Sequence, residues 1–207
     1  MKEFIIFFII FFAVFAVSLV IFNGRFIYAQ LKYDFLGPAP IDITDNESKP
    51  VDIADNKSKI EKGLFWLPVS GSADNLVTLV IPSIGVNAPI VLSGNIDESL
   101  IQKDLEKGVV RYGNSNVILG HSSAYPWYKG NYGSVFSLLN KLQTGDEIYI
   151  YSNNKKYSYK VSEKQINSPK NISFQETSED SAIYLVSCWP INTNWKRIAI
   201  KAIAIDK

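Results

Sequence analysis

The chain has 207 residues, 47% of them apolar and 13% aromatic, which is enough to build the core of one globular domain. Lys and Arg number 21 against 20 Asp and Glu, so the net charge of +1 argues against a nucleic acid as partner. The single cysteine excludes an intramolecular disulfide, and the fold must therefore be stable without one.

The N-terminal segment, residues 1–32, is predicted to be a signal anchor. Nineteen consecutive uncharged residues run from Phe4 to Phe22. At about 1.5 Å rise per residue, a helix of this size crosses a hydrocarbon core of about 30 Å. The run is longer than the roughly 7–15 residues of a signal-peptide core, and Ile27 fits a cleavage site poorly, so we expect one retained transmembrane helix.

A polar linker is predicted next, over residues 33–63. It contains a ten-residue repeat, IDITDNESKP (41–50) followed by VDIADNKSKI (51–60). A segment with so few apolar residues does not fold alone, which favours a spacer. Cation binding by the Asp and Asn pairs is the alternative, but the Gly and terminal Glu of a calcium-binding loop are missing.

From residue 64 to 207, short apolar runs alternate with turn residues, which predicts a mainly β domain. Strands are expected at residues 76–86, 88–93, 116–122, 147–152, 156–162, 182–188 and 197–205. Apolar residues at helical spacing predict two brief helices, at 98–109 and around 134–147. Many short strands with few helices indicate a closed β-barrel.

The only cysteine, Cys188, and the only histidine, His121, each lie at the end of a predicted strand. Either residue alone would most often be structural. Eight residues separate Cys188 from Arg197, and a hairpin would therefore pair them, with Cβ atoms roughly 4.5–5.5 Å apart. Strand alternation also places Arg197 on the face opposite Ile198 and Ile200, away from the core.

These three side chains suit acyl transfer through a thioester. The thiolate is the nucleophile, and a free cysteine with a pKa of about 8.5 supplies little of it at neutral pH, so a nearby cation increases reactivity. His121 can protonate a departing amine. Arg197 can hold an oxyanion or the backbone carbonyls of an extended peptide.

The sequence resembles the sortases, membrane-anchored cysteine transpeptidases of bacteria. The resemblance is strongest in ILGHSS, in VFSLLNKLQTGDEIYIY and in LVSC followed nine residues later by Arg197, in the family's order. It covers residues 76–205 together with the N-terminal anchor. It implies an eight-stranded sortase β-barrel in which His121, Cys188 and Arg197 are the catalytic residues.

The resemblance also implies a substrate class. The enzyme would cleave a C-terminal sorting signal of the Leu-Pro-x-Thr-Gly type in exported proteins and keep the acyl part on Cys188. The acyl group would then pass to an amine, either of a peptidoglycan precursor or of a pilin lysine. We expect Ser122, Val186 and Ser187 to contact the substrate.

Some features depart from the family pattern. Ser187 stands where the family commonly has Thr. The short Cys-to-Arg spacing favours a pilin-type sortase, but an Asp-Pro-aromatic lid motif is not found, since YDFLG (33–37) lacks the Pro; the subclass stays open. Asp97, Glu98 and Asp104 lie roughly where some sortases hold calcium, but they fit a solvated helix face equally well. No metal or other cofactor is assigned.

Substrate recognition is expected in two long polar segments, residues 162–180 and 122–133, because long loops beside a rigid scaffold commonly carry recognition. The second segment contains the aromatic residues Tyr125, Trp127 and Tyr128. Packing onto the barrel and contact with the substrate are both consistent with this cluster.

Other functional classes fit less well. Papain-like enzymes place Cys before His, the reverse of this chain. The L,D-transpeptidases have Arg two residues after Cys, where this chain has Pro190. A non-enzymatic alternative is a membrane-tethered extracellular β-barrel that binds a peptide or glycan. It predicts an inert, structural Cys188 far from His121.

The charges that flank the predicted membrane helix do not decide its orientation. Lys2 and the amino terminus stand on one side, and Arg25 and Lys32 on the other, so the positive charges are nearly balanced. The chemistry above places the catalytic domain on the extracellular side of a bacterial cell membrane, with a single pass and the lipid bilayer as partner of the N-terminal helix.

Overall fold

The computed structural model describes residues 2–37, 77–124, 128, 130–153, 155–169 and 181–205. The predicted linker with its ten-residue repeat lies outside these residues, apart from residues 33–37. The barrel strands all fall within them.

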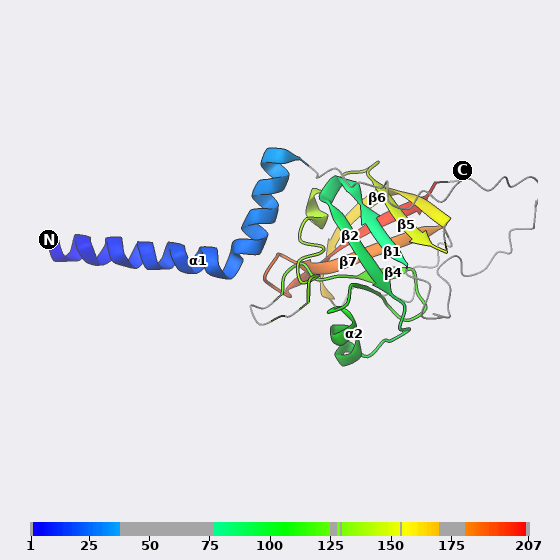
Figure 1. The fold of residues 1–207 in the computed structure, drawn as a ribbon, viewed down its shortest axis with the longest axis horizontal. Helices are drawn as coiled ribbons and strands as arrows, with labels where there is room; N and C mark the ends of the chain where they lie inside the picture. Colours follow the sequence, from blue (N-terminus) through cyan, green and yellow to red (C-terminus); the bar gives the residue numbers. More distant parts are fainter. Residues whose placement is uncertain are drawn as a thin grey trace, which may run out of the picture.

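Eight strands form a closed barrel in the order β1-β2-β3-β4-β7-β8-β6-β5 (Figure 1). Their bounds are β1 Thr78–Ile81, β2 Val86–Val91, β3 Val109–Arg111, β4 Val117–Leu119, β5 Glu147–Ser152, β6 Lys155–Asn167, β7 Ala182–Trp189 and β8 Lys196–Ala204. Neighbouring strands are antiparallel except in the pairs β2–β3 and β4–β7, which are parallel. The predicted closed eight-stranded barrel is therefore confirmed.

The barrel interior is filled by alternate residues of each strand. On β7 the inward residues include Ile183 and Leu185, and on β8 they include Ile198 and Ile200, all of which are at most 2% exposed. Burial of each such side chain stabilises the fold by roughly 1.5–3 kcal/mol. The alternation fixes which residues of β7 and β8 face outward, because successive side chains point to opposite faces.

Helices are few outside the N-terminal segment. The described helices are α1 Lys2–Leu36, α2 Glu98–Asp104 and the one-turn 3-10 helices η2 Pro82–Ile84 and η3 Leu139–Lys141.

Helix α2 begins at a side-chain cap and ends earlier than predicted. The Asp97 carboxylate accepts hydrogen bonds from the backbone N–H groups of Ser99 and Leu100, at 2.9 and 3.2 Å. The predicted helix extended to residue 109, but Val109–Arg111 forms the short strand β3 between β2 and β4. Pairing with two neighbours therefore overrides the helical pattern here.

The helix predicted around residues 134–147 is replaced by turns and η3. The backbone hydrogen bonds of this segment join residues three apart, such as Ser137 N–H to Ser134 C=O and Lys141 N–H to Leu138 C=O. Phe136 instead donates its N–H to the carbonyl of His121, at 2.9 Å. The apolar side chains of this segment are buried in the barrel end, which their spacing did correctly indicate.

Strand β6 is longer than predicted. The sequence indicated a strand at 156–162, but pairing with β8 continues to Asn167 after a register shift between Val161 and Glu163. Residues 162–167 of the expected recognition segment are therefore part of the sheet, and residues 170–180 lie outside the described part of the chain.

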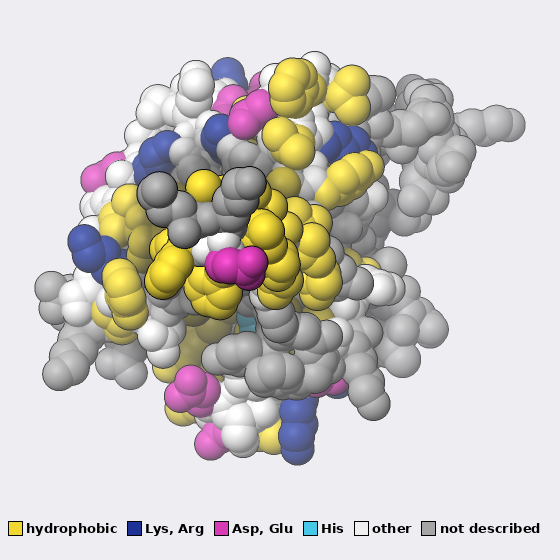
Figure 2. All heavy atoms as spheres, turned by 90° about the vertical axis from the view of Figure 1, so that its left-hand side faces the viewer, with side chains coloured by type: hydrophobic (Ala, Val, Ile, Leu, Met, Phe, Trp, Pro, Cys, Tyr) yellow, Lys and Arg dark blue, Asp and Glu magenta, His cyan; other side chains and the backbone are white. Residues whose placement is uncertain are grey.

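Helix α1 carries large apolar side chains on its surface, including Phe4, Phe7 and Phe12, each more than 60% exposed. Figure 2 looks toward the N-terminal end of this helix and shows hydrophobic side chains around it. Among the described residues, no helix combines the length and hydropathy needed to cross a membrane.

The C-terminal end of α1 lies against the barrel. Tyr33 packs on the hydrophobic core, and Asp34 forms an ion pair with Lys141 of η3, at 3.0 Å. The helix continues to Leu36, four residues past the predicted end of the anchor at residue 32. The start of the predicted linker is thus helical.

Candidate active site

His121, Cys188 and Arg197 lie at the ends of three strands that are adjacent in the barrel, in the order β4, β7, β8. Cys188 pairs directly with Arg197 across the antiparallel β7–β8 ladder. The expected pairing of these two residues is confirmed. In such a pair the Cβ atoms are roughly 4.5–5.5 Å apart.

The parallel pairing of β4 with β7 brings the histidine to the same place. Leu119 is in register with Val186, and the N–H of Gly120 donates to the Val186 carbonyl at 3.1 Å. The same register, continued for two residues past Leu119, brings His121 to the level of Cys188 on β7. Cys188 therefore lies between the imidazole strand and the guanidinium strand.

The thiol and the guanidinium share the outer face of the barrel. Ser187 pairs with Ile198, which is in the core, so the residues on either side of this pair point outward. Cys188 and Arg197 are both partly exposed. The predicted orientation of Arg197 away from the core is confirmed.

Ser187 faces inward and joins the two strand ends. Its side chain is 3% exposed, and its Oγ donates a hydrogen bond to the carbonyl of Gly120, at 2.7 Å. This bond links the residue before the cysteine to the residue before the histidine. Ser187 is thus on the face opposite Cys188, and its hydroxyl is committed to the scaffold.

The other two predicted substrate contacts, Ser122 and Val186, are each 3% exposed. Val186 is on the outer face with Cys188, and Ser122 directly follows His121. The Ser122 Oγ has no hydrogen-bond partner among the described residues. Both side chains present little surface in this conformation, and their contact with substrate stays a prediction.

We expect Ser187→Ala to lower stability by about 1–2 kcal/mol, because the Gly120 carbonyl loses its donor. Turnover should fall by about tenfold, since small displacements of the reacting groups are costly. Ser187→Thr keeps the hydroxyl and is the matched control. Urea unfolding of the parent and the two variants measures the change in stability, and kcat measures the change in turnover. Equal kcat in the Ala variant and the parent would contradict it.

The segment that carries His121 is also fixed by close packing. A Cβ added at Gly120 would lie 2.4 Å from the Phe136 ring, so only glycine fits there. The Phe136 N–H donates to the His121 carbonyl at 2.9 Å. Phe136 thereby sets the position of the strand end from which the imidazole projects.

The loops around the site are joined to each other. The Asn192 N–H, in the β7–β8 loop, donates to the Ser123 Oγ at 3.0 Å. Arg197 Nη1 donates to the carbonyls of Asn194 and Lys196, both at 3.1 Å. The backbone just before Arg197, at the end of the loop and the start of β8, therefore holds the guanidinium.

The surroundings of the imidazole change its titration. Burial lowers the pKa of His121, and the negative charge of Glu106 partly opposes this effect. A pKa below the ordinary value means that the neutral imidazole predominates at neutral pH. His121 can then accept a proton as well as return it.

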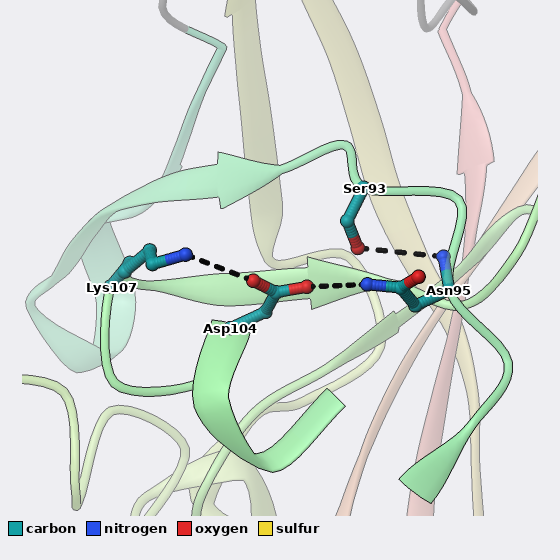
Figure 3. Close-up of polar contacts among 4 residues, drawn as sticks. All are labelled: Ser93, Asn95, Asp104 and Lys107. Carbon is teal, nitrogen blue, oxygen red and sulfur yellow. Dashed lines mark hydrogen bonds and ion pairs between the residues drawn. The ribbon is translucent and has the colours of Figure 1, made fainter. Parts of the chain in front are cut away.

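The acidic residues considered for calcium have other partners. Asp97 caps α2, and the Ser99 hydroxyl donates to the same carboxylate oxygen at 2.6 Å. Asp104 accepts hydrogen bonds from Asn95 Nδ2 at 3.0 Å and from Lys107 Nζ at 3.1 Å (Figure 3). Within the described residues, no three acidic, His or Cys side chains form a metal-binding group. In this structure the carboxylates of Asp97 and Asp104 therefore have structural partners within α2 and beside it.

Asp104 instead braces the turn before α2. Burial alone would raise the pKa of Asp104, but hydrogen bonds from Ser93, Asn95 and Lys107 outweigh it and hold the pKa below its usual value. A lowered pKa contributes stability that is present above the unfolded-state pKa of about 4 and is lost as the pH falls further.

We therefore expect Asp104→Asn to be less stable than the parent by about 1 kcal/mol at pH 7, because Asn95 and Lys107 donate to different carboxylate oxygens and an amide keeps only one of these acceptors. The difference should shrink below about pH 4. Urea unfolding at both pH values measures it. Glu98→Gln on the exposed face of α2 is the control. A difference that persists unchanged at pH 3 would refute the assigned role of the charge.

A closed barrel with a cysteine between a histidine strand and an arginine strand defines a class of candidate cysteine acyltransferases. The family model described as "Sortase domain" matches residues 79–204. The chain therefore belongs to the sortase family, as the resemblance in its sequence indicated.

Comparison with other proteins agrees with this assignment. The chain is 27% identical to Sortase A of Bacillus anthracis over 130 residues, which are 58% of this chain and 55% of that protein. It thus matches about half the length of this relative. Two solved structures, Sortase A from Corynebacterium diphtheriae and sortase C1 from Streptococcus suis, share the fold, each with a TM-score of 0.51. They are 22% and 20% identical, cover 64% of this chain, and are themselves covered to 61% and 74%.

The sequence does not decide whether the aromatic residues after His121 pack onto the barrel or contact the substrate. The structure places Tyr128 beside His121, whereas Tyr125 and Trp127 lie outside the described residues. In the sequence, the two glycines that follow Tyr128, Gly130 and Gly133, indicate that its ring packs within the loop. Small residues leave room for a nearby ring.

Proposed function

We propose that the protein is a cysteine transpeptidase that cleaves a Leu-Pro-x-Thr-Gly-type sorting signal near the C-terminus of exported proteins. The observation that carries the proposal is the direct pairing of Cys188 with Arg197 in a sortase-family barrel, with His121 on the adjoining strand end. The acceptor is an amine of a peptidoglycan precursor or a pilin lysine.

The first half-reaction forms the thioester. The Cys188 thiolate attacks the scissile carbonyl carbon, and the carbonyl oxygen becomes an oxyanion that Arg197 stabilises. The C–N bond then breaks, and the imidazolium of His121 gives its proton to the departing amine. The acyl part remains on the sulfur, and His121 is left neutral.

The second half-reaction reverses these roles. The acceptor amine attacks the thioester carbon, neutral His121 takes the proton from the attacking nitrogen, and the thiolate leaves. The lowered pKa of His121 suits the acceptance and return of a proton in one cycle. No cofactor takes part in either step.

Arg197 would change partners during the reaction. Its guanidinium donates to the backbone carbonyls of Asn194, in the β7–β8 loop, and of Lys196, at the start of β8. An extended peptide or an oxyanion offers stronger acceptors, and charge-assisted bonds form preferentially to them. Catalytic hydrogen bonds often become short only in the substrate complex.

Helix α1 is proposed to anchor the enzyme in a bacterial membrane, with the barrel on the extracellular side. The uncharged run from Phe4 to Phe22 and the exposed apolar surface of the helix support the membrane contact, and the proposed action on exported proteins is the reason for placing the barrel outside. Protease added to intact cells should digest the barrel and leave a protected N-terminal fragment. A barrel that is digested only after lysis would refute the orientation.

The activity is tested with the full-length chain in detergent, a panel of Leu-Pro-x-Thr-Gly-type peptides and an amine acceptor. Mass spectrometry of the peptides should show the N-terminal part of one peptide joined to the acceptor amine, and Cys188→Ala should give none. If no peptide is cleaved and Cys188 resists alkylation in the folded protein, the thiol is structural and the proposal fails.

A further inference from the structure

Tyr128 is the aromatic residue that meets the candidate catalytic histidine. The centroids of the two rings are 5.4 Å apart, and the ring planes are inclined by 80°, an edge-to-face arrangement. This geometry is favourable for aromatic pairs, because the positive edge of one ring meets the negative face of the other. The contact restricts the rotation of the imidazole.

The hydroxyl of Tyr128 is held at the opposite end of the ring. It donates a hydrogen bond to the carbonyl of Leu105, at 2.8 Å. Leu105 follows α2 directly and is 5% exposed, in a cluster with Ile101 and Val110 on the outside of the barrel. The ring therefore bridges from a rigid part of the scaffold to His121.

Two glycines make room for this ring. A Cβ added at Gly130 would lie 2.5 Å from the Tyr128 hydroxyl and 2.6 Å from the carbonyl of Glu106. A Cβ added at Gly133 would lie 2.8 Å from the same ring and 2.6 Å from the Cβ of Ala124. The loop after His121 is thus closely packed around Tyr128, and the ring has a defined position.

We propose that Tyr128 is a positioning residue for His121: its ring holds the imidazole edge to face, and its hydroxyl fixes that ring to the end of α2. The inference rests on the proposed function, because it takes His121 as the proton carrier of the reaction. It goes further by assigning the orientation of the imidazole to a residue outside the catalytic three.

The ring also shields the imidazole from water. Burial lowers the pKa of His121 and raises that of Tyr128, while Glu106 opposes the first change and adds to the second. The charged and titratable groups near His121 are Tyr128 on its own loop, Glu106 after α2, and Cys188 on the adjoining strand β7, while Arg197 lies one strand further away, on β8. Removal of the ring should expose the imidazole and move its pKa upward, toward the ordinary value.

A single histidine makes the test direct. Because His121 is the only histidine of the chain, the imidazole NMR signals of a protein without a histidine tag report this residue alone. The full-length chain in detergent is compared with Tyr128→Ala and Tyr128→Phe. Tyr149→Ala, on β5 at the opposite side of the barrel, is the matched control. Each protein is titrated, and its kcat, KM and Tm are measured.

Tyr128→Ala should raise the titration midpoint of His121 and lower kcat by about ten- to hundredfold, with little change in KM, since misplacement of a reacting group acts on turnover. Tyr128→Phe keeps the ring and should restore the midpoint and most of kcat. Tyr149→Ala should match the parent in the titration midpoint, in kcat and in KM.

Two results would overturn the positioning role. One is a Tyr128→Ala variant with the midpoint and kcat of the parent. The other is a Tyr128→Phe variant as impaired as Tyr128→Ala, because the ring would then contribute nothing. A parent protein that transfers no peptide would instead refute the proposed function, and the NMR titration would still report whether Tyr128 orders His121.

Discussion

Arg197→Ala is expected to lower kcat/KM by about 10²–10³-fold, the usual cost of removing one oxyanion-stabilising donor. The residue pairs with Cys188 and faces out of the core, so its loss removes charge beside the reacting carbon without opening a cavity in the barrel. The melting temperature should change little, since only two bonds to exposed backbone carbonyls are lost.

Two further variants show whether the guanidinium itself is needed. Arg197→Lys keeps a positive charge but not the planar fork of donors, so it should restore only part of the activity. Lys201→Ala removes a cation from the same outward face of β8, two outward positions further along the strand, and should leave kcat/KM unchanged. An Arg197→Ala variant within threefold of the parent would contradict the assigned role.

His121→Ala is expected to lower kcat/KM by about 10²–10⁴-fold, the contribution of a positioned general acid and base. The backbone of residue 121 should keep its bond to Phe136, so the strand end stays in place. Added imidazole should restore part of the activity by filling the vacated position. A variant with unchanged kcat/KM, or one that imidazole does not rescue at all, would argue against proton transfer by this residue.

The pH dependence of kcat/KM is a second test of proton transfer by His121. Because burial lowers the pKa of His121, the imidazolium fraction should be lost as the pH rises through a midpoint below about 6.5. In a plot of kcat/KM against pH, the curve of the parent should bend at that midpoint. The curve of His121→Ala should lack this bend. Glu106 and Tyr128 are the groups that act on the imidazole or contact it.

The architecture was largely predictable from local patterns. Alternating apolar residues marked most strands, and the hairpin from Cys188 to Arg197 followed from the short separation of two strand ends. Strand β3 was missed because its first residue, Val109, continues the apolar spacing of the predicted helix at 98–109, and only pairing with β2 and β4 defines the strand. Local sequence carries no record of such non-local pairing.

The site was predictable only in part, because its geometry also depends on non-local pairing. The chemistry of His121, Cys188 and Arg197 indicated their roles, but the placement of His121 beside Cys188 depends on the parallel β4–β7 pair. That pair joins strands more than sixty residues apart and has no turn between them to reveal it. The inward orientation of Ser187 and the packing of Tyr128 also needed the assembled barrel.

The central claim is that Cys188 carries the acyl group, and intact-protein mass spectrometry tests it most directly. Cys188 is the only cysteine of the chain, so a hydroxylamine-sensitive mass increase has one thiol to which it can belong. The full-length protein, mixed with a cleaved sorting peptide and quenched in acid, should gain the mass of the acyl part. Hydroxylamine should remove it, and Cys188→Ala should not gain it. Peptide transfer without any adduct on Cys188, or transfer by Cys188→Ala, would contradict the account.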